Sequence, residues 1–235
     1  MTDRYFLPQF PEDELCELGG SEFHHLAHVM RGSPGDRLTV FDGQGTEADA
    51  EIIRLSKTSA ALRLAARRRD SLQTESEIVL AVSIPKADRF RWLVEKATEL
   101  GVARLIPLQT TRSVVAPGAV KLDKMRQAVI EACKQSGRNR LMPIEPPTPW
   151  EEFVSAQIPT AATLVADPNG LPLSDVAKSW AKNGSLLLVV GPEGGLTETE
   201  LREAIEAGAQ TVSLGPRILR IETAALALAA VFSLR

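Results

Sequence analysis

The first part of the chain alternates between apolar and polar positions in short runs, a pattern typical of β-strands that are buried on one face. Three such runs occur, at residues 36–42, 47–55 and 59–65. Two glycines in the segment 42–45 supply a turn between the first two runs. A helix is expected before them at residues 22–30, with Ser21 as its N-cap and Gly32 just past its end. The pattern predicts a small β-barrel or curled sheet with one helix.

From about residue 77 the pattern changes to continuous apolar runs that alternate with segments of helical periodicity. The continuous runs predict buried strands at residues 78–84, 103–108, 163–166, 185–190 and 211–214. The helical spacing predicts helices at residues 88–100, 121–136, 173–182, 198–207 and 222–234. Buried strands with intervening helices imply an α/β fold, layered around a largely parallel sheet.

A polar stretch separates the two patterns. Residues 67–74 have no apolar periodicity, which is typical of a linker. We therefore expect two domains, at residues 1–72 and 73–235. The proline-rich segment 143–149 is interpreted as an extended connection inside the second domain, because residues that precede proline disfavour the helical conformation.

The composition is that of an ordinary globular protein. The chain has 235 residues, of which 44% are hydrophobic and 24% charged. No apolar stretch approaches the roughly 18 to 20 residues of a membrane span, so we expect none. The first residues are acidic where a secretory signal would be basic and then apolar, so a cytoplasmic location is expected. Cys16 and Cys133 lie too far apart for a metal knuckle or a disulfide framework.

The net charge of −3 argues at first against a nucleic-acid partner, because such proteins usually carry excess lysine and arginine. The average hides a local excess, however. Residues 104–140 contain eight basic and two acidic residues, a charge of +6. This segment predicts a local basic surface, and the alternative is an ordinary solvated helix face.

Glycines gather where the predicted strand 185–190 ends. The segment 191–195 reads Gly-Pro-Glu-Gly-Gly, a tight loop in which backbone groups can approach a ligand without hindrance from Cβ atoms. Thr197 and Glu200 follow at capping-box spacing and open the next helix. The alternative is an ordinary strand-to-helix turn. A phosphate ligand fits poorly, because Glu193 would repel an anion and no phosphate-loop motif is present.

The connection 214–224 is unusually apolar for a surface loop. Ile218, Leu219 and Ile221 could cover a flat ligand such as a purine, or they could tuck under the sheet. Polar groups are offered by Glu222, Thr223 and the start of the last helix. Ligands of open parallel sheets lie beyond the carboxyl ends of the strands. Together the two loops favour an adenine-bearing ligand held by backbone and apolar contacts.

A third cluster is basic and polar. A helix is expected to end at Gly137, and a rim that faces a polyanion is predicted around it and after the strand 103–108. The candidate RNA contacts on this rim are Arg112, Lys134, Gln135, Ser136 and Arg138. Surface salt bridges are the alternative. His24 and His28 share a helix face, but the set of ligands for a metal is incomplete, so no metal is expected and the role of the three histidines, with His25, stays open.

Several segments taken together resemble one known family. They read, in chain order, FHHLAHVMRGSPGDRLTVFDGQG, KADRFRWLVEKATELGVARLIPL, TTRSVV, EACKQSGRNRLMPI, LLLVVGPEGGLTETE and LGPRILRIETAALAL. In this combination the chain resembles the RsmE family of small-subunit (16S) ribosomal RNA uridine-N3 methyltransferases, which belongs to the SPOUT class.

The resemblance implies a PUA-like β-barrel for RNA, followed by an α/β domain with a deep C-terminal trefoil knot that holds S-adenosyl-L-methionine. It also implies a homodimer that acts on small-subunit ribosomal RNA or on the assembled 30S particle, without a metal. The cofactor contacts that it assigns are Ala166, Asp167, Val190, Gly191, Glu193, Gly195, Leu214, Gly215, Ile218, Leu219 and Thr223.

Within this reading, Arg220 is a candidate stabiliser of a uracil oxygen and Glu222 a candidate proton acceptor, or both residues brace the loop. Two other functions stay open on the sequence. One is a SPOUT methyltransferase that acts on tRNA or on a ribose hydroxyl, and the other is a non-enzymatic ribosome-assembly factor that binds RNA.

Overall fold

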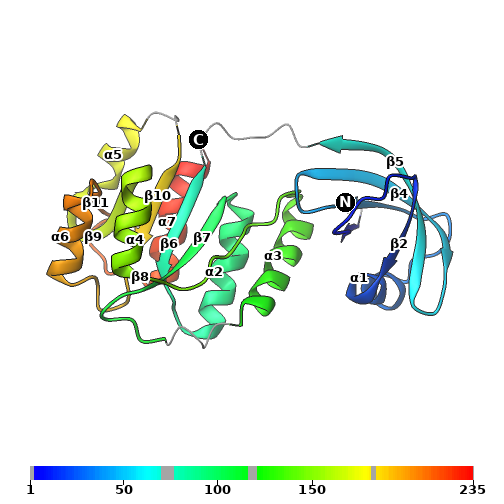
Figure 1. The fold of residues 1–235 in the computed structure, drawn as a ribbon, viewed down its shortest axis with the longest axis horizontal. Helices are drawn as coiled ribbons and strands as arrows, with labels where there is room; N and C mark the ends of the chain where they lie inside the picture. Colours follow the sequence, from blue (N-terminus) through cyan, green and yellow to red (C-terminus); the bar gives the residue numbers. More distant parts are fainter. Residues whose placement is uncertain (1–2, 70–76, 116–120, 181–183, 235) are drawn as a thin grey trace. The chain divides into compact units, whose positions relative to one another are not determined.

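The computed structural model describes residues 3–69, 77–115, 121–180 and 184–234. The chain forms two compact units, whose elements are labelled in Figure 1. The first contains Met1–Gln73 and Ile130–Leu141, and the second contains Thr74–Val129 and Met142–Arg235. The predicted domain boundary between residues 72 and 73 falls in the segment 70–76, outside the described residues.

The N-terminal unit is built on one curled sheet of five strands in the order β1-β3-β4-β5-β2. The strands are β1 (Arg4–Phe6), β2 (Leu15–Gly19), β3 (Arg37–Phe41), β4 (Thr46–Leu55) and β5 (Ser59–Arg69). β1 runs parallel to β3, and the other neighbours are antiparallel. The predictions of β3, β4 and β5 are confirmed, whereas β1 and β2 were not predicted.

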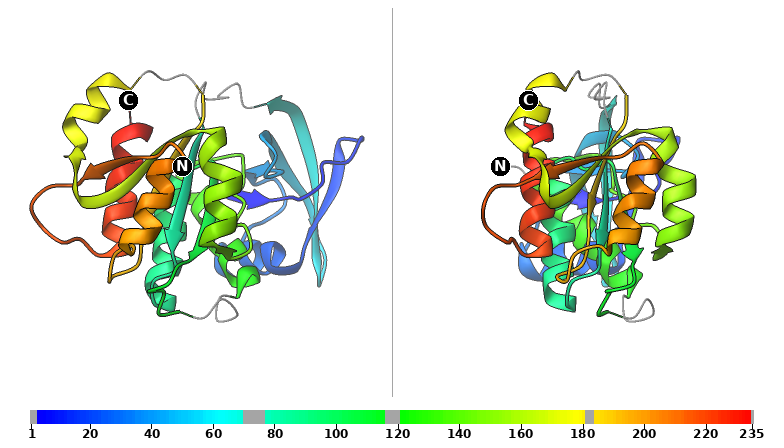
Figure 2. Two further views of the ribbon diagram at one scale, coloured as in Figure 1. Left: turned by 60° about the vertical axis from the view of Figure 1, so that its left-hand side comes forward. Right: turned by 90° about the vertical axis from the view of Figure 1, so that its left-hand side faces the viewer.

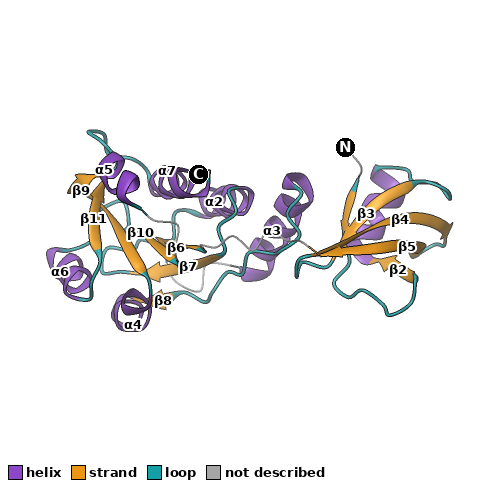
Figure 3. Cartoon of the chain, turned by 90° about the horizontal axis from the view of Figure 1, so that it is seen from above, coloured by secondary structure: helices purple, strands orange, loops and turns teal. Residues whose placement is uncertain are grey.

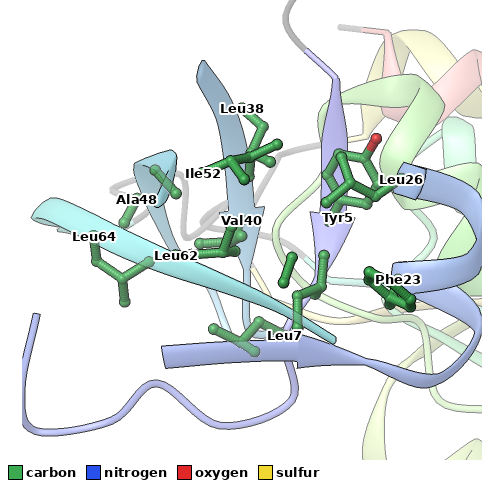
Figure 4. Close-up of a cluster of buried hydrophobic side chains, with 13 residues drawn as sticks. Tyr5, Leu7, Phe23, Leu26, Leu38, Val40, Ala48, Ile52, Leu62 and Leu64 are labelled. Atoms are coloured by element: carbon green, nitrogen blue, oxygen red, sulfur yellow. The ribbon is translucent and has the colours of Figure 1, made fainter. Parts of the chain in front are cut away.

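The concave side of this sheet carries the core. Tyr5, Val40 and Leu62 are fully buried, and Phe23 and Leu26 cover them from the helical segment (Figure 4). That segment consists of α1 (Gly20–His24), which continues as a π-helix over His25–Val29. Burying an apolar side chain of this size contributes about 1.5–3 kcal/mol to folding.

Two local predictions for this unit were wrong. The helix begins at Gly20 with Gly19 as N-cap, so Ser21 lies inside the first turn and caps nothing. Arg67, Arg68 and Arg69 do not belong to a linker, because β5 continues through them and they pair with the start of β4. Pairing with the start of β4 extends β5 through these arginines, although this part of the sequence has no apolar periodicity of its own.

The hairpin between β3 and β4 explains why residues from the middle of the chain belong to this unit. Gly43 and Gly45 both have positive φ, at 73° and 103°, as the sequence predicts for the turn. The amide of Gly45 donates to the carbonyl of Asn139, and the amide of Leu141 donates to that of Gly43, each at 3.0 Å. The segment that follows the predicted basic helix is thus held against the hairpin.

The second unit contains a sheet of six strands in the order β11-β9-β10-β6-β7-β8, and every neighbouring pair is parallel. The strands are β6 (Ile78–Ser83), β7 (Arg104–Gln109), β8 (Thr148–Pro149), β9 (Ala162–Pro172), β10 (Leu186–Val190) and β11 (Gln210–Ser213). Every residue of the central strands β6 and β10 is buried. The predicted parallel α/β layering is confirmed.

Helices cover both faces of this sheet, as Figures 2 and 3 show. One face carries α2 (Ala87–Glu99), α5 (Leu173–Ser179) and α7 (Ile221–Ser233), and the other carries α4 (Trp150–Gln157) and α6 (Glu198–Glu206). The helix α3 (Leu122–Ser136) contributes its residues up to Val129 to this unit. The sequence analysis missed α4, which begins directly after the proline-rich segment. No helix in the described part of the chain has the length and apolarity to cross a membrane.

The order of the strands positions the candidate site. Because all the strands are parallel, their carboxyl ends lie at one edge of the sheet, where the following loops can meet. The loops that follow β10 and β11 are the two that the sequence singled out, and β9 lies between these strands.

Candidate functional site

The carboxyl ends of β9, β10 and β11 enclose a pocket of about 340 Å³. Three segments line it: residues 166–168, residues 190–196 and residues 212–224 in part. Of the eleven predicted cofactor residues, ten line this pocket, and Thr223 alone does not. Eight further residues line the pocket. Five of them belong to the two loops that the sequence singled out, namely Pro192, Gly194, Arg217, Ile221 and Ala224, and three lie outside those loops, namely Pro168, Leu196 and Val212.

The loop 191–195 is tight because it closes on itself. The amide of Gly195 donates to the carbonyl of Pro192 at 2.8 Å, and Gly195 has a positive φ of 69°. A Cβ atom at Gly191 would lie 3.0 Å from the Leu196 side chain, so a larger residue would crowd the base of the loop. Both glycines are therefore required by the shape of the loop.

The predicted capping box after this loop is confirmed. The Thr197 hydroxyl accepts from the amide of Glu200 at 3.2 Å, and the Glu200 carboxylate accepts from the amide of Thr197 at 2.7 Å. The other oxygen of Glu200 accepts from the amide of Thr111 at 2.8 Å. Burial acts to raise the pKa of Glu200, but the hydrogen bonds from Thr111 and Thr197 outweigh it and hold the pKa below its usual range. The side chain is thus an anion that ties two segments together.

The wall formed by β9 is a bulge. Consecutive residues of β11 pair with Val165 and then with Leu171, so residues 166–170 leave the ladder, and residues 166–168 of this segment line the pocket. The carboxylate of Asp167 accepts from the amide of Asn169 at 2.8 Å and shapes this bulge.

Gly170 makes the bulge possible. A Cβ atom at this position would lie 2.5 Å from the backbone nitrogen of Val212, which no side chain permits. The sequence analysis did not single out Gly170. An isolated glycine inside a strand pattern signals a bulge or a close backbone approach, but the predicted strand 163–166 ends before Gly170, whereas β9 continues to Pro172.

The apolar residues of the third segment, residues 212–224, differ in how far they are exposed. Ile218 is 82% exposed at the pocket, and Leu219 is half-buried there. Ile221, the first residue of α7, is 3% exposed, and it also lines the pocket. The segment therefore offers apolar surface to the pocket while it anchors itself in the core.

The two candidate catalytic residues do not line the pocket. Arg220 is exposed at the N-cap position of α7, between two residues that do line it. Glu222 is 7% exposed, and its carboxylate lies 3.8 Å from the guanidinium Nε of Arg89 on α2. The other oxygen of Glu222 is buried and has no hydrogen-bond partner among the residues that the structure describes. The geometry brings Glu222 to Arg89 and not to the pocket.

The candidate RNA contacts differ in their exposure and in their hydrogen-bond partners. Arg112 donates to the carbonyl of Gly194 at 2.7 Å and so reaches the pocket loop. Gln135 is exposed near the end of α3, and the hydroxyl of Ser136 donates to the carbonyl of Ala132 at 2.7 Å. Burial lowers the pKa of Arg138, whose guanidinium remains charged at neutral pH.

Lys134 does not fit the prediction of a rim that faces RNA. Its side chain is 9% exposed, and its ammonium group lies 3.3 Å from the carboxylate of Glu22. The same group lies 5.6 Å from the centre of the Tyr5 ring. Its charge is thus already paired inside the N-terminal unit.

The residues of the basic segment 104–140 belong to two different units, and some of their charges are already paired within their own unit. Arg104 donates to Gln157 at 3.1 Å and lies 3.8 Å from Glu145. Lys124 and Arg126 remain exposed on α3. The local charge available to a polyanion is therefore smaller than the sequence count of +6 indicates.

The rings of His24 and His28 lie close together, with their planes inclined at 44°. The ring centres of His24 and His28 lie 4.8 Å apart. Within the described ranges, no three His, Cys, Asp or Glu side chains are grouped so that they could hold a metal ion.

The chemistry of the pocket follows from its lining. Backbone groups of glycine-rich turns and apolar side chains dominate, which suits a ligand with a flat apolar part that makes directional hydrogen bonds. Asp167 and Glu193 add two negative charges against the one positive charge of Arg217, and this balance favours a ligand with a cationic group over a phosphate.

Comparison with known protein families gives two matches. Residues 72–233 match the family described as an RNA methyltransferase domain, and residues 18–65 match the RNA methyltransferase PUA domain.

Curated relatives share one name. The chain is 33% identical to ribosomal RNA small subunit methyltransferase E of Bacillus subtilis, over 95% of this chain and 93% of the relative. It is 35% identical to the protein of the same name from Synechocystis, over 87% of this chain and 68% of the relative.

Solved structures of similar proteins also match this chain over nearly its whole length. The ribosomal RNA small subunit methyltransferase E of Neisseria gonorrhoeae, bound to S-adenosyl methionine, is 33% identical and matches with a TM-score of 0.89 over 100% of this chain and 98% of that one. A methyltransferase of Legionella pneumophila, in complex with the same cofactor, is 30% identical with a TM-score of 0.86, over 98% of this chain and 96% of that one.

Proposed function

Because this chain belongs to the ribosomal RNA small subunit methyltransferase E family, we propose that it methylates N3 of one uridine in small-subunit ribosomal RNA. The chain is an S-adenosylmethionine-dependent ribosomal RNA methyltransferase. The observation that carries the proposal is that ten of the eleven residues assigned from the sequence resemblance line one pocket. Relatives whose solved structures hold S-adenosylmethionine share the fold over nearly the whole chain.

The pocket residues fit this cofactor. Leu214, Ile218 and Leu219 offer apolar surface for the adenine ring, and the loop 191–195 offers backbone groups without Cβ atoms in the way. Asp167 and Glu193 complement positive charge. A pocket of about 340 Å³ lies within the usual range of about 300–1,000 Å³ for small-molecule sites.

Bound S-adenosylmethionine supplies an electrophilic methyl group on a sulfonium sulfur. The protein must align the uracil N3 with that group and lower the cost of the negative charge that develops as N3 loses its proton. Arg220 is our candidate for this electrostatic role, since it is exposed between two pocket residues. The position of Glu222 beside Arg89 favours the bracing role over proton acceptance.

Further parts of the proposal concern the assembly. The resemblance to the SPOUT class supports a deep trefoil knot through the segments 191–195 and 214–224, and a homodimer. The match of residues 18–65 to the RNA methyltransferase PUA domain supports RNA binding by the N-terminal unit. Since the substrate belongs to the ribosome, we place the enzyme in the cytoplasm.

The decisive experiment uses ribosomal RNA from a strain that lacks the gene. The purified protein is incubated with labelled S-adenosylmethionine and either the free 16S RNA or the assembled 30S particle, and the RNA is then read by primer extension. We expect label in the RNA and one new stop, because a methyl group at N3 blocks Watson–Crick pairing. Label without a stop would indicate another acceptor atom, such as a ribose hydroxyl, and would contradict the assignment to N3.

A further inference from the structure

A closed turn follows strand β7, outside the pocket. The amide of Thr110 donates to the hydroxyl of Ser113 at 2.9 Å, and the amide of Ser113 donates back to the carbonyl of Thr110 at 3.0 Å. Residues 110–113 therefore hold their own shape, with Thr111 and Arg112 exposed at the apex.

The apex of this turn is joined to the pocket loop by a side chain. The guanidinium of Arg112 donates to the carbonyl of Gly194 at 2.7 Å, a charge-assisted hydrogen bond. The Arg112 side chain also covers Gly194, because its Cδ lies 3.3 Å from where a Cβ of Gly194 would stand. Gly194 itself lines the pocket.

A second connection passes through Glu200, which does not line the pocket. Its two oxygens accept from backbone amides of different segments, Thr111 at 2.8 Å and Thr197 at 2.7 Å. The residue is 4% exposed and lies 89 positions from Thr111 in the chain. A carboxylate offers an acceptor on each oxygen, whereas a glutamine amide offers only one. Only an acid of this length satisfies both amides.

We propose that Arg112 and Glu200 are positioning residues that hold the loop 191–195 in the shape that binds the cofactor. The turn 110–113 acts as a brace, fixed to the middle of the loop through Arg112 and to the helix that follows it through Glu200. This inference rests on the proposed function for the identity of the cofactor, but the brace itself concerns the loop alone. It assigns Arg112 to the cofactor side of the enzyme, where the sequence predicted an RNA contact.

The first test measures S-adenosylmethionine affinity by calorimetry in the absence of RNA. We expect the dissociation constant to rise about tenfold in Arg112→Ala and in Glu200→Gln, which is the loss of roughly one hydrogen bond to a charged group. Arg112→Lys restores part of the affinity, because an ammonium group can also donate to the Gly194 carbonyl. Arg202→Ala and Glu206→Gln remove the same charges from exposed positions of α6 and should leave the affinity unchanged.

The variant Thr197→Ala serves to distinguish an effect on the position of the loop 191–195 from an effect on the stability of the fold. It removes the capping hydroxyl, which also donates to the Glu200 carboxylate at 3.0 Å, but keeps both backbone amides on Glu200, so it should lower the melting temperature and change the affinity for the cofactor much less than Glu200→Gln does. If the affinity instead followed the melting temperature across all the variants, the positioning role would be refuted.

The second test needs no ligand. Hydrogen–deuterium exchange of the peptide that covers residues 191–196 should be faster in Arg112→Ala and Glu200→Gln than in the wild type, and unchanged in Arg202→Ala. Unchanged exchange together with unchanged affinity would overturn the inference and return Arg112 to the role of an RNA contact. A wild-type protein that binds no S-adenosylmethionine would refute the proposed function, while the exchange measurement would still decide whether the brace exists.

Discussion

The ammonium group of Lys134 lies 3.3 Å from the carboxylate of Glu22, and both side chains are about nine-tenths buried in the N-terminal unit. Glu22 also accepts from the amide of Phe6 at 3.1 Å, so the pair ties α1 to β1 and to the end of α3. A surface lysine that binds RNA and a lysine that holds a domain together behave differently on mutation. This difference leads to the first prediction.

Lys134→Ala should lower the free energy of unfolding by about 3 kcal/mol, because it leaves the Glu22 carboxylate buried without its cation. Urea denaturation measures the loss. Gln135→Ala, one residue further along and exposed, should change stability by less than about 0.5 kcal/mol. A stable Lys134→Ala variant with weakened RNA binding would instead support the original assignment to RNA.

Gly170→Ala should destroy the bulge of β9, because the added Cβ would lie 2.5 Å from the Val212 nitrogen. We expect a loss of at least about 2 kcal/mol of stability, or of measurable cofactor binding where the fold survives. Thermal unfolding and calorimetry follow the two effects. Gly19→Ala is the control, since the nearest atom to its added Cβ is 4.0 Å away. A Gly170→Ala variant with wild-type behaviour would show that the bulge is dispensable.

The depressed pKa of Glu200 predicts a specific pH dependence. A carboxyl group with a lower pKa in the folded than in the unfolded state stabilises the fold fully above its ordinary pKa, and this contribution disappears as the pH falls through the folded-state value. The stability difference between the wild type and Glu200→Gln should therefore be constant from about pH 6 to 8 and shrink on acidification below the ordinary carboxyl pKa of about 4.3. Urea unfolding over this range measures it. A difference that grows on acidification would contradict the assignment.

Arg220→Ala should reduce the rate of methyl transfer about 100-fold, the usual effect of removing one group that stabilises charge in a transition state. The affinity for S-adenosylmethionine should stay within a few-fold, because Arg220 does not line the pocket. Single-turnover transfer assays and calorimetry separate the two quantities. Glu222→Gln should affect stability more than transfer, since Glu222 faces Arg89. Undiminished transfer in Arg220→Ala would discard its electrostatic role.

RNA binding should weaken steeply as salt increases, with a slope of roughly −0.7 to −0.9 in log–log form for each phosphate contacted. Lys124→Ala and Arg126→Ala should each reduce the magnitude of the slope by about one contact, because both side chains are exposed on α3. Arg104→Ala should not, because this guanidinium already contacts Gln157 and Glu145. Fluorescence anisotropy at several salt concentrations tests all three, and a flat dependence in the wild type would exclude this surface.

The sequence was most informative where structure depends on neighbours along the chain. The apolar runs predict β6, β7 and β10, and Thr197 and Glu200 predict the start of α6 through capping chemistry alone. The glycine-rich loop and the apolar connection after β11 also predict ligand-binding segments, and the structure brings both to one pocket.

What the sequence did not reveal depends on partners that are far apart in the chain. Nothing near Glu200 indicates that its second oxygen is taken by Thr111, and nothing near Lys134 indicates Glu22. The two-residue strand β8 is too short for any periodicity. Glu222 carries the right chemistry for a proton acceptor, but only the packing of α7 on α2 reveals that it faces Arg89.

The arrangement of the central strands also has a consequence for the synthesis of the protein. β6 and β10 pair along their length, although residues 84–185 separate them in the chain. One edge of β6 pairs with β7, which follows soon after it in the chain, but the other edge has no partner until β10 has been synthesised. Pairings over such sequence distances are slow to form. Because residues of the segment 214–224 line the pocket, the cofactor site cannot form before this segment has been synthesised.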